Sequence, residues 1–294
     1  MQQDTARSEK IFLVGMILSM TCWGISWTSG KILSSYSGPI IISFLRFAFT
    51  FLSLLFIVPI LKSKLTIAKD GLLDLVCAAI MISIYTFLFF RGLITGKPGA
   101  GGVLVTILNP IISYFIMLVM NRRRPTRNEV IGLALGISAG VILLKLLTDA
   151  SDIFRAGNLY FLFASVSWAI LSVFTSRSSR YGEPVTFSFY MYGISTLIML
   201  FFTDWNTVLT TLQSGDGIFW FNLFFSATVT TAIATTFYFV ATAKIGASRA
   251  SSFIFLVPFS ASLGSWFFFN EIPQVNTIIG GVLGIGAVLI LNKK

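Results

Sequence analysis

The sequence predicts an all-α integral membrane protein with ten transmembrane helices in two inverted five-helix repeats. Three observations lead to this fold class: the composition, ten long apolar runs and an internal duplication. Of the 294 residues, 55% are hydrophobic and only 11% are charged, and the mean hydropathy is +0.87. Because a soluble domain carries roughly 25% charged residues, this composition excludes soluble, disordered and collagen-like classes.

The ten apolar runs are each close to the roughly 20 residues that a helix needs to cross a bilayer. The runs are continuous and do not alternate, which favours helices over the strands of a membrane barrel. The first run is too long for a signal-peptide core and lacks a small-residue cleavage site, so it is predicted to be a retained anchor. In chain order, the predicted helices cover residues 11–33, 38–60, 71–94, 99–120, 128–147, 156–178, 184–203, 216–242, 247–269 and 273–292.

The two halves of the chain are related by an internal duplication. A shift of 148 positions pairs Pro110 with Pro258, and a shift of 145 positions pairs Trp23 with Trp168. Because each half has an odd number of spans, the second copy is expected to lie inverted in the membrane. The predicted divisions are a tail at 1–10, a first repeat at 11–147 and a second, inverted repeat at 156–292.

The basic residues are unevenly distributed between the two ends of the spans. Fifteen Lys and Arg residues fall on the side that holds both termini and five fall on the other side, while Arg46 alone lies within a span. By the positive-inside rule, both termini are expected in the cytoplasm. The compact chain suggests the inner (plasma) membrane of a bacterium. This rule also explains the cluster at 122–124 without a nucleic-acid partner.

Several kinds of chemistry are excluded or disfavoured. The chain has no histidine, and Cys22 and Cys77 lie in apolar runs without metal or redox spacing. The Gly-rich stretch at 96–102 lacks the order of a phosphate loop and is interpreted as a turn. No catalytic residue, metal site or cofactor is therefore predicted, and the chain is not expected to be an enzyme. Mid-span carboxylates are absent, which disfavours simple proton antiport, although Asp74 and Glu271 near span ends stay open.

Polar residues inside the spans are the candidates for a transport pathway. Arg46 is either a substrate contact or a structural residue that reaches the membrane surface. Helix eight carries Thr228, Thr231, Thr235, Tyr238 and Thr242 at helical spacing, as a lining or a packing face. The corresponding positions of helix three, through Ser83, Phe87 and Phe90, are more apolar, so an asymmetric cavity is expected.

Prolines and tryptophans add further candidates. Pro110 and Pro258 each remove a helix hydrogen bond, which frees carbonyls near Thr106 or Asn109 and creates either a hinge or a packing kink. Tryptophan rings could stack on a flat molecule or anchor the helices. The residues predicted to contact a transported molecule are Trp23, Trp27, Ser43, Arg46, Thr106, Asn109, Trp168, Tyr190, Thr231, Thr235 and Tyr238.

Glycines repeat at spacings of four residues in the fifth and tenth predicted helices. Gly132, Gly136 and Gly140 form one such face, and Gly280 and Gly284 form another. Small residues at this spacing let helices approach closely. The faces are expected to pack within the chain or to form a dimer, so a monomer or weak homodimer is expected.

The chain resembles EamA-type members of the drug/metabolite transporter superfamily over residues of about 10–292. The resemblance implies transport of small metabolites, often outward, through a central cavity lined by helices 1 to 4 and 6 to 9, with no particular substrate. It rests on CWGISWTSGK at 22–31, Pro39 followed by Arg46, GVLVTILNP at 102–110, ASSFIFLVP at 250–258 and the NE-I-P pattern at 270–273.

The first hypothesis is a secondary transporter, an exporter or facilitator of a small organic metabolite such as an amino acid or aromatic compound, working by alternating access. The second hypothesis is a nucleotide-sugar or phosphorylated-sugar exchanger. That activity would need paired basic residues, for which Lys31, Arg91 and Lys97 are fringe candidates beside Arg46. The hypothesis of another class is a membrane scaffold or intramembrane enzyme.

Overall fold

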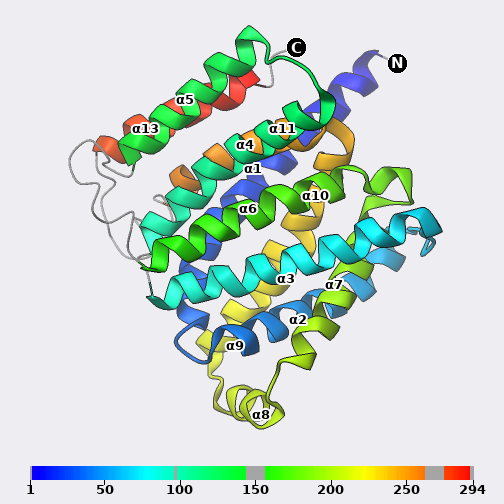
Figure 1. The fold of residues 1–294 in the computed structure, drawn as a ribbon. Helices are drawn as coiled ribbons and strands as arrows, with labels where there is room; N and C mark the ends of the chain where they lie inside the picture. The colour runs from blue at the N-terminus through cyan, green and yellow to red at the C-terminus, as the bar shows by residue number, and fades with distance from the viewer. Residues whose placement is uncertain (1, 96–97, 144–155, 262–274, 292–294) are drawn as a thin grey trace.

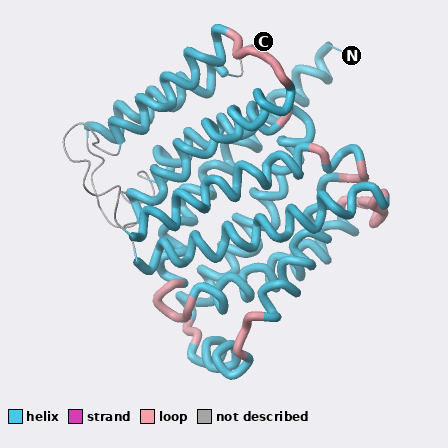
Figure 2. Tube along the Cα trace, in the orientation of Figure 1, coloured by secondary structure: helices cyan, strands magenta, loops and turns pink. Residues whose placement is uncertain are grey.

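The computed structural model describes residues 2–95, 98–143, 156–261 and 275–291, and almost all of them are helical (Figure 1, Figure 2). The first half contains α1 (Gln2–Leu33), α2 (Pro39–Ile60), η1 (Lys69–Gly71), α3 (Leu72–Thr95), α4 (Pro98–Asn121) and α5 (Arg127–Leu143). The second half contains α6 (Ala156–Ser176), η3 (Ser178–Arg180), α7 (Pro184–Phe201), α8 (Trp205–Ser214), α9 (Gly217–Phe224), η4 (Phe225–Thr235), α10 (Thr236–Ile245), α11 (Ala247–Ser252), η5 (Phe253–Leu256) and α13 (Val275–Leu291).

By length and composition, six helical segments of the described chain could cross a membrane. The predicted number of ten is not reached there, because three further apolar helices are shorter. The predicted end of 128–147, the end of 247–269 and the start of 273–292 lie outside the described residues. The six segments are Phe12–Leu33, Pro39–Ile60, Lys69–Thr95, Leu159–Arg180, Pro184–Phe201 and Gly217–Ile245.

Two elements differ from the sequence prediction. The region predicted as one helix at 216–242 consists of α9, a π-helical segment η4 and α10. The short helix α8 was not predicted, because a search for long apolar runs does not detect ten residues of mixed polarity. The Asp204 side chain caps α8 by accepting a hydrogen bond from the Thr207 backbone N–H at 2.9 Å.

Local sequence signals explain where several helices begin. Pro39 and Pro184 occupy the first positions of α2 and α7, where a missing N–H has no helical partner to lose. At α5, the Thr126 backbone N–H donates to Glu129 at 2.7 Å, and the Glu129 N–H donates to the Thr126 hydroxyl at 3.3 Å. This reciprocal pair is a capping box.

The helices pack side by side in one bundle, with α8 at its edge (Figure 1). Helix α3 packs against α6, α2 against α7 and α5 against α13, while α1 packs against η4 and η5. Many large apolar side chains face outward, among them Phe56, Leu73, Phe201 and Phe221, each at least 67% exposed. Such an exterior suits lipid rather than water.

Glycines of α5 and α13 lie at close contacts with neighbouring helices. A Cβ atom at Gly132 would lie 2.4 Å from Leu291 Cγ of α13, and one at Gly284 would lie 2.8 Å from the Phe255 carbonyl oxygen of η5. Of the two interpretations of these glycine faces, the structure assigns Gly132 and Gly284 to packing within the chain.

The two predicted hinge prolines have different surroundings. Helix α4 continues through Pro110 without a break in helical structure. The chain before Pro258 changes from α11 to the 3-10 turn η5 and becomes α-helical again at 257–261. The two positions that the duplication pairs are therefore not equivalent in local geometry.

Candidate functional site

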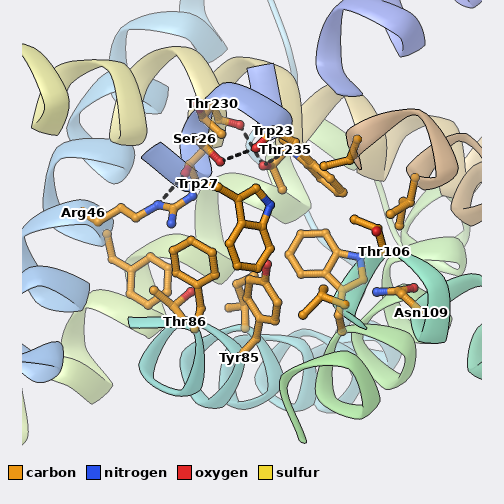
Figure 3. A pocket seen from close by; sticks show the side chains of 18 of the residues that line it. Trp23, Ser26, Trp27, Arg46, Tyr85, Thr86, Thr106, Asn109, Thr230 and Thr235 are labelled. Atoms are coloured by element: carbon orange, nitrogen blue, oxygen red, sulfur yellow. Dashed lines mark hydrogen bonds between the residues drawn. The ribbon is translucent and has the colours of Figure 1, made fainter. Parts of the chain in front are cut away.

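A central cavity lies between helices of both halves (Figure 3). It has about 590 Å³ of atom-free space, including the part that is open to the outside, and aromatic rings leave little room for water. Ligand sites are commonly concave, mostly apolar and equipped with a few polar groups. The lining residues are Trp23, Ser26, Trp27, Arg46, Phe47, Ile82, Tyr85, Thr86, Phe89, Val105, Thr106, Asn109, Trp168, Tyr192, Thr230, Thr231, Thr235, Ile254 and Val257.

Arg46 of α2 supplies a positive charge to this cavity, and its side chain reaches inward beside the aromatic rings (Figure 3). The residue is only 8% exposed. Its Nε donates a hydrogen bond to Thr231 Oγ1 at 2.9 Å, and its Cζ lies 5.9 Å from the centres of the Phe89 and Phe90 rings. Among the described residues, no carboxylate forms an ion pair with Arg46. A charge buried in this way makes Arg46 a candidate functional residue of a membrane protein.

Two threonines of the π-helical segment η4 hold the polar groups of the cavity in place. Thr231 Oγ1 donates to the Ser226 carbonyl at 2.7 Å, and Thr235 Oγ1 donates to the Thr230 carbonyl at 2.8 Å, each five residues back. The same hydroxyls accept hydrogen bonds from side chains that line the cavity. Thr231 accepts from Arg46 Nε, and Thr235 accepts from Trp23 Nε1 at 3.1 Å. The π-helical turn therefore orients both hydroxyls, which fits the frequent occurrence of π-bulges at functional sites.

A cluster of aromatic rings forms the apolar wall. The Trp23 ring lies 4.9 Å from the centres of both Trp168 and Tyr238. Tyr85 and Trp168 lie 4.5 Å apart, and their planes are inclined at 61°. Such edge-on arrangements are favoured by the charge distribution of the rings. The wall thus presents ring faces and edges to the cavity.

Two buried hydroxyl groups at the cavity have no hydrogen-bond partner within the described residues. They are Tyr192 Oη of α7 and Thr230 Oγ1 of η4, and the two residues are at most 1% exposed. Buried polar atoms in native proteins are nearly always paired. Their position beside the cavity is consistent with a polar ligand as the missing partner.

Most of the predicted contact residues meet at this cavity. Tyr238 packs behind the wall against Trp23 and Trp168. Ser43 is buried in α2 but does not line the cavity, and Tyr190 lies elsewhere, donating to the Leu65 carbonyl at 2.8 Å. The predicted residues that line the cavity are Trp23, Trp27, Arg46, Thr106, Asn109, Trp168, Thr231 and Thr235.

Helix α3 contributes residues that sequence reasoning missed, namely Tyr85, Thr86 and Phe89. A shift of 148 positions pointed to Ser83, Phe87 and Phe90 instead. The shift of 145 positions, which aligns the first two helices of each half, pairs Tyr85 and Thr86 with Thr230 and Thr231. That shift was the signal that could have found them. Ser26, Tyr192 and Thr230 also line the cavity and were not singled out.

Two further members of the polar series predicted for the helix at 216–242 contact neighbouring helices. Thr228 and Ser53 of α2 share a hydrogen bond of 2.8 Å, and Thr242 donates to Thr175 of α6 at 3.1 Å. The series therefore lines the cavity at its centre and packs at its ends.

A second pocket lies beyond these contacts. It is bounded by the ends of α4, α6 and α10, and its lining includes Arg177, Arg180 and Thr242. Arg177 Nη1 lies 3.6 Å from Asp74 Oδ2, so this arginine is already paired. Between the central cavity and the second pocket, the Tyr238 hydroxyl lies 3.4 Å from Ser172 Oγ of α6.

Outside the spans, hydrogen bonds shift the pKa of several surface groups. The Tyr36 hydroxyl donates to Asp216 at 2.7 Å and lowers the pKa of that carboxyl, and the Phe219 N–H adds to the effect. The Asp74 carboxylate accepts from the Tyr181 hydroxyl at 2.9 Å and raises the pKa of Tyr181. These groups connect helix ends and lie away from the central cavity.

Known proteins resemble the chain over nearly its whole length. The model of the EamA-like transporter family matches residues 10–145 and 155–293. The uncharacterized transporter YoaV of Bacillus subtilis is 25% identical over 276 residues, covering 92% of this chain and 93% of the relative. The uncharacterized transporter YyaM of the same organism is 27% identical over 243 residues, covering 80% and 77%.

A plant protein and a solved structure also match the chain. A chloroplastic WAT1-related protein of Arabidopsis thaliana is 26% identical over 172 residues, which are 55% of this chain and 40% of the relative. A crystal structure of another protein superposes with a TM-score of 0.71 at 16% identity, over 96% of both chains. At that identity the superposition shows a shared fold.

Proposed function

The chain belongs to the EamA-like transporter family, and from that premise we propose that it is a secondary transporter that moves a small organic metabolite through the central cavity by alternating access. The observation that carries the proposal is the cavity itself, because helices of both halves build it around one buried arginine. A site between two halves opens to either face when the halves rock against each other.

The helix contacts support two inverted repeats within a ten-helix arrangement. Helix α1 packs against η4, and its counterpart α6 packs against α3, the counterpart of η4. Helices α2 and α7 pack against each other, as do α5 and α13. Exchanging the two halves therefore maps the first two contacts onto each other and each of the other two onto itself, as a two-fold relation requires.

The packing of Tyr238 against neighbouring rings supports the view that the cavity is closed on the side of the second pocket. Helix α6 and the continuous segment formed by η4 and α10 both contribute to the central cavity and to the second pocket, and the Tyr238–Ser172 contact joins them between those lining residues. With both termini in the cytoplasm, this closed side is the cytoplasmic one. Opening it requires Tyr238 to leave Trp23 and Trp168.

Transport without proton coupling fits the lining. Among the described residues, no Asp or Glu lines the cavity, and Arg46 is its single ionised group. Phosphorylated sugars are poorly matched to one cation, and the fringe candidates Lys31 and Arg91 do not line it. Facilitated transport or exchange is therefore the proposed mode.

Uptake into proteoliposomes tests this proposal. Purified protein should give saturable entry of at least one compound from a radiolabelled panel of amino acids, organic acids, nucleosides and sugar phosphates, without a pH gradient. Ser26→Phe should abolish this entry because it fills the cavity from α1, whereas Ser35→Phe, in an exposed turn, should not. Entry that requires a pH gradient, or that survives Ser26→Phe in folded protein, would contradict the proposal.

A further inference from the structure

We propose that the central cavity binds an amphipathic organic anion, an aromatic carboxylate without an amino group, whose carboxylate lies on the Arg46 guanidinium. The inference rests on the proposed transport function, since it names the substrate class of the same cavity. Three features of the lining carry it: the charge, the missing counterpart for an ammonium group and the aromatic wall.

The positive charge of Arg46 favours a ligand with one negative charge. Arg46 is 8% exposed and forms no ion pair within the described residues. Its Nε donates a hydrogen bond to Thr231, whereas Nη1 and Nη2 form no hydrogen bond within the described residues. A carboxylate matches such a free pair of nitrogens with two parallel hydrogen bonds. It also neutralises a charge that is costly to leave unpaired in a membrane.

An ammonium group on the ligand would find no matching charge. Among the described lining residues there is no carboxylate, and the acceptors are hydroxyls, backbone carbonyls and the Asn109 amide. Asn109 Oδ1 already accepts a hydrogen bond from Ser113 at 3.2 Å. An amino acid would therefore place its cation beside Arg46 without a counter-ion, and it would leave the cavity with a net charge.

The remainder of the ligand meets aromatic rings. Trp23, Tyr85 and Trp168 form a continuous wall with ring centres 4.5–4.9 Å apart. A flat ring of the ligand that packs against this wall gains stacking and apolar contact. The unpaired hydroxyls of Tyr192 and Thr230 are available to a second polar group of the ligand.

Phosphorylated ligands fit less well than carboxylates. A phosphate monoester carries close to two charges at neutral pH, and Arg46 balances only one. Lys31 Nζ already donates to the Leu93 carbonyl at 2.7 Å, and Arg91 is exposed outside the cavity. A single carboxylate is the anion that this lining balances.

Four compounds that share a phenyl ring test the carboxylate and the ammonium group separately. Hydrocinnamate has the ring and the carboxylate, phenylalanine adds an ammonium group, phenethylamine keeps only the ammonium group, and hydrocinnamyl alcohol has no charge. Binding to purified wild-type protein in detergent is measured by calorimetry and by the fluorescence of the cavity tryptophans. Hydrocinnamate should bind at least about tenfold more tightly than each of the other three, as expected for charge-assisted hydrogen bonds.

Variants assign the preference to Arg46. Arg46→Gln should remove the advantage of hydrocinnamate over hydrocinnamyl alcohol, and Arg46→Lys should retain part of it. Arg91→Gln is the matched control, because it removes an exposed arginine outside the cavity and should leave the preference unchanged. The four compounds decide the question on wild-type protein even if Arg46→Gln does not fold.

The outcomes separate this inference from the proposed function. Phenylalanine binding as tightly as hydrocinnamate, or a preference that survives Arg46→Gln, overturns the inference. Saturable uptake of other compounds in that case leaves the transporter in place. Tight hydrocinnamate binding that depends on Arg46, without saturable uptake of any panel compound by folded protein, supports the site and overturns the transport function.

Discussion

At the scale of single residues, the guanidinium of Arg46 is held by a threonine rather than by a carboxylate. Thr231 Oγ1 accepts from Arg46 Nε at 2.9 Å and donates to the Ser226 carbonyl at 2.7 Å. These two hydrogen bonds fix the direction of the Arg46 side chain. The terminal nitrogens Nη1 and Nη2 remain directed toward the cavity. The sequence singled out both residues, since one is the only charged group well inside a predicted span and the other belongs to a polar series.

Thr231→Val should destabilise the protein by about 1–3 kcal/mol, because it leaves Arg46 Nε buried without an acceptor. Thermal unfolding in detergent measures the change. Thr231→Ser keeps the hydroxyl and is the matched control, so it should retain most of the stability. Equal losses in the two variants would show that keeping the hydroxyl does not preserve stability, and would contradict the role given to this hydrogen bond.

The surface pair of Tyr36 and Asp216 predicts a pH dependence. The hydrogen bond lowers the pKa of Asp216 in the folded protein below its unfolded value of about 3.9. The stability that the pair contributes is therefore present at neutral pH, and it is lost as the pH falls through the folded pKa. Tyr36→Phe should lower the melting temperature at pH 6, and its difference from wild type should shrink below about pH 4. A difference that stays constant across this range would contradict the assignment.

At the scale of elements, a π-helical segment and a close helix crossing shape the site. In η4 the wider π-helical turn lets the threonine hydroxyls donate five residues back, and it sets the register of the lining residues. Nearby, a Cβ atom at Gly24 of α1 would lie 2.6 Å from the Ala261 backbone nitrogen. This crossing brings α1 against the helical segment at 257–261, which begins one residue before Pro258.

Gly24→Ala should destabilise the protein by about 1–3 kcal/mol, because backbone atoms cannot move aside as a flexible side chain can. Gly38→Ala is the matched control: its Cβ would meet nothing within 4 Å, and its φ of −67° suits alanine. Thermal unfolding of the two variants compares them directly. A Gly24→Ala protein as stable as the Gly38→Ala protein would rule out the close crossing.

At the scale of the whole molecule, the arrangement depends on orientation in the membrane. Helices α1, α2 and α3 follow one another as candidate spans, so the turn at 34–38 and the loop at 61–68 belong on opposite faces. The excess of basic residues on the side of both termini predicts that the loop at 61–68 is cytoplasmic.

Cysteine labelling in intact cells tests this orientation. In a background without Cys22 and Cys77, Ser35→Cys should react with an impermeant maleimide in intact cells, since Ser35 is exposed in the outer turn. Thr66→Cys, which is exposed in the other loop, should react only after the membrane is opened. The reverse pattern would place both termini outside the cytoplasm.

The sequence by itself determined the class of the protein and many residues of the site. Long apolar runs predict helices in lipid because transfer into lipid depends on local composition, and Arg46, Trp23 and Thr235 stand out by type and spacing. Only the tertiary structure decided that Tyr85 and Thr86 face the cavity while Ser43 and Tyr190 do not. The rotation of a helix about its axis, and the register shift of a π-helical turn, depend on the partners that each helix meets, and local hydrophobicity does not encode those partners.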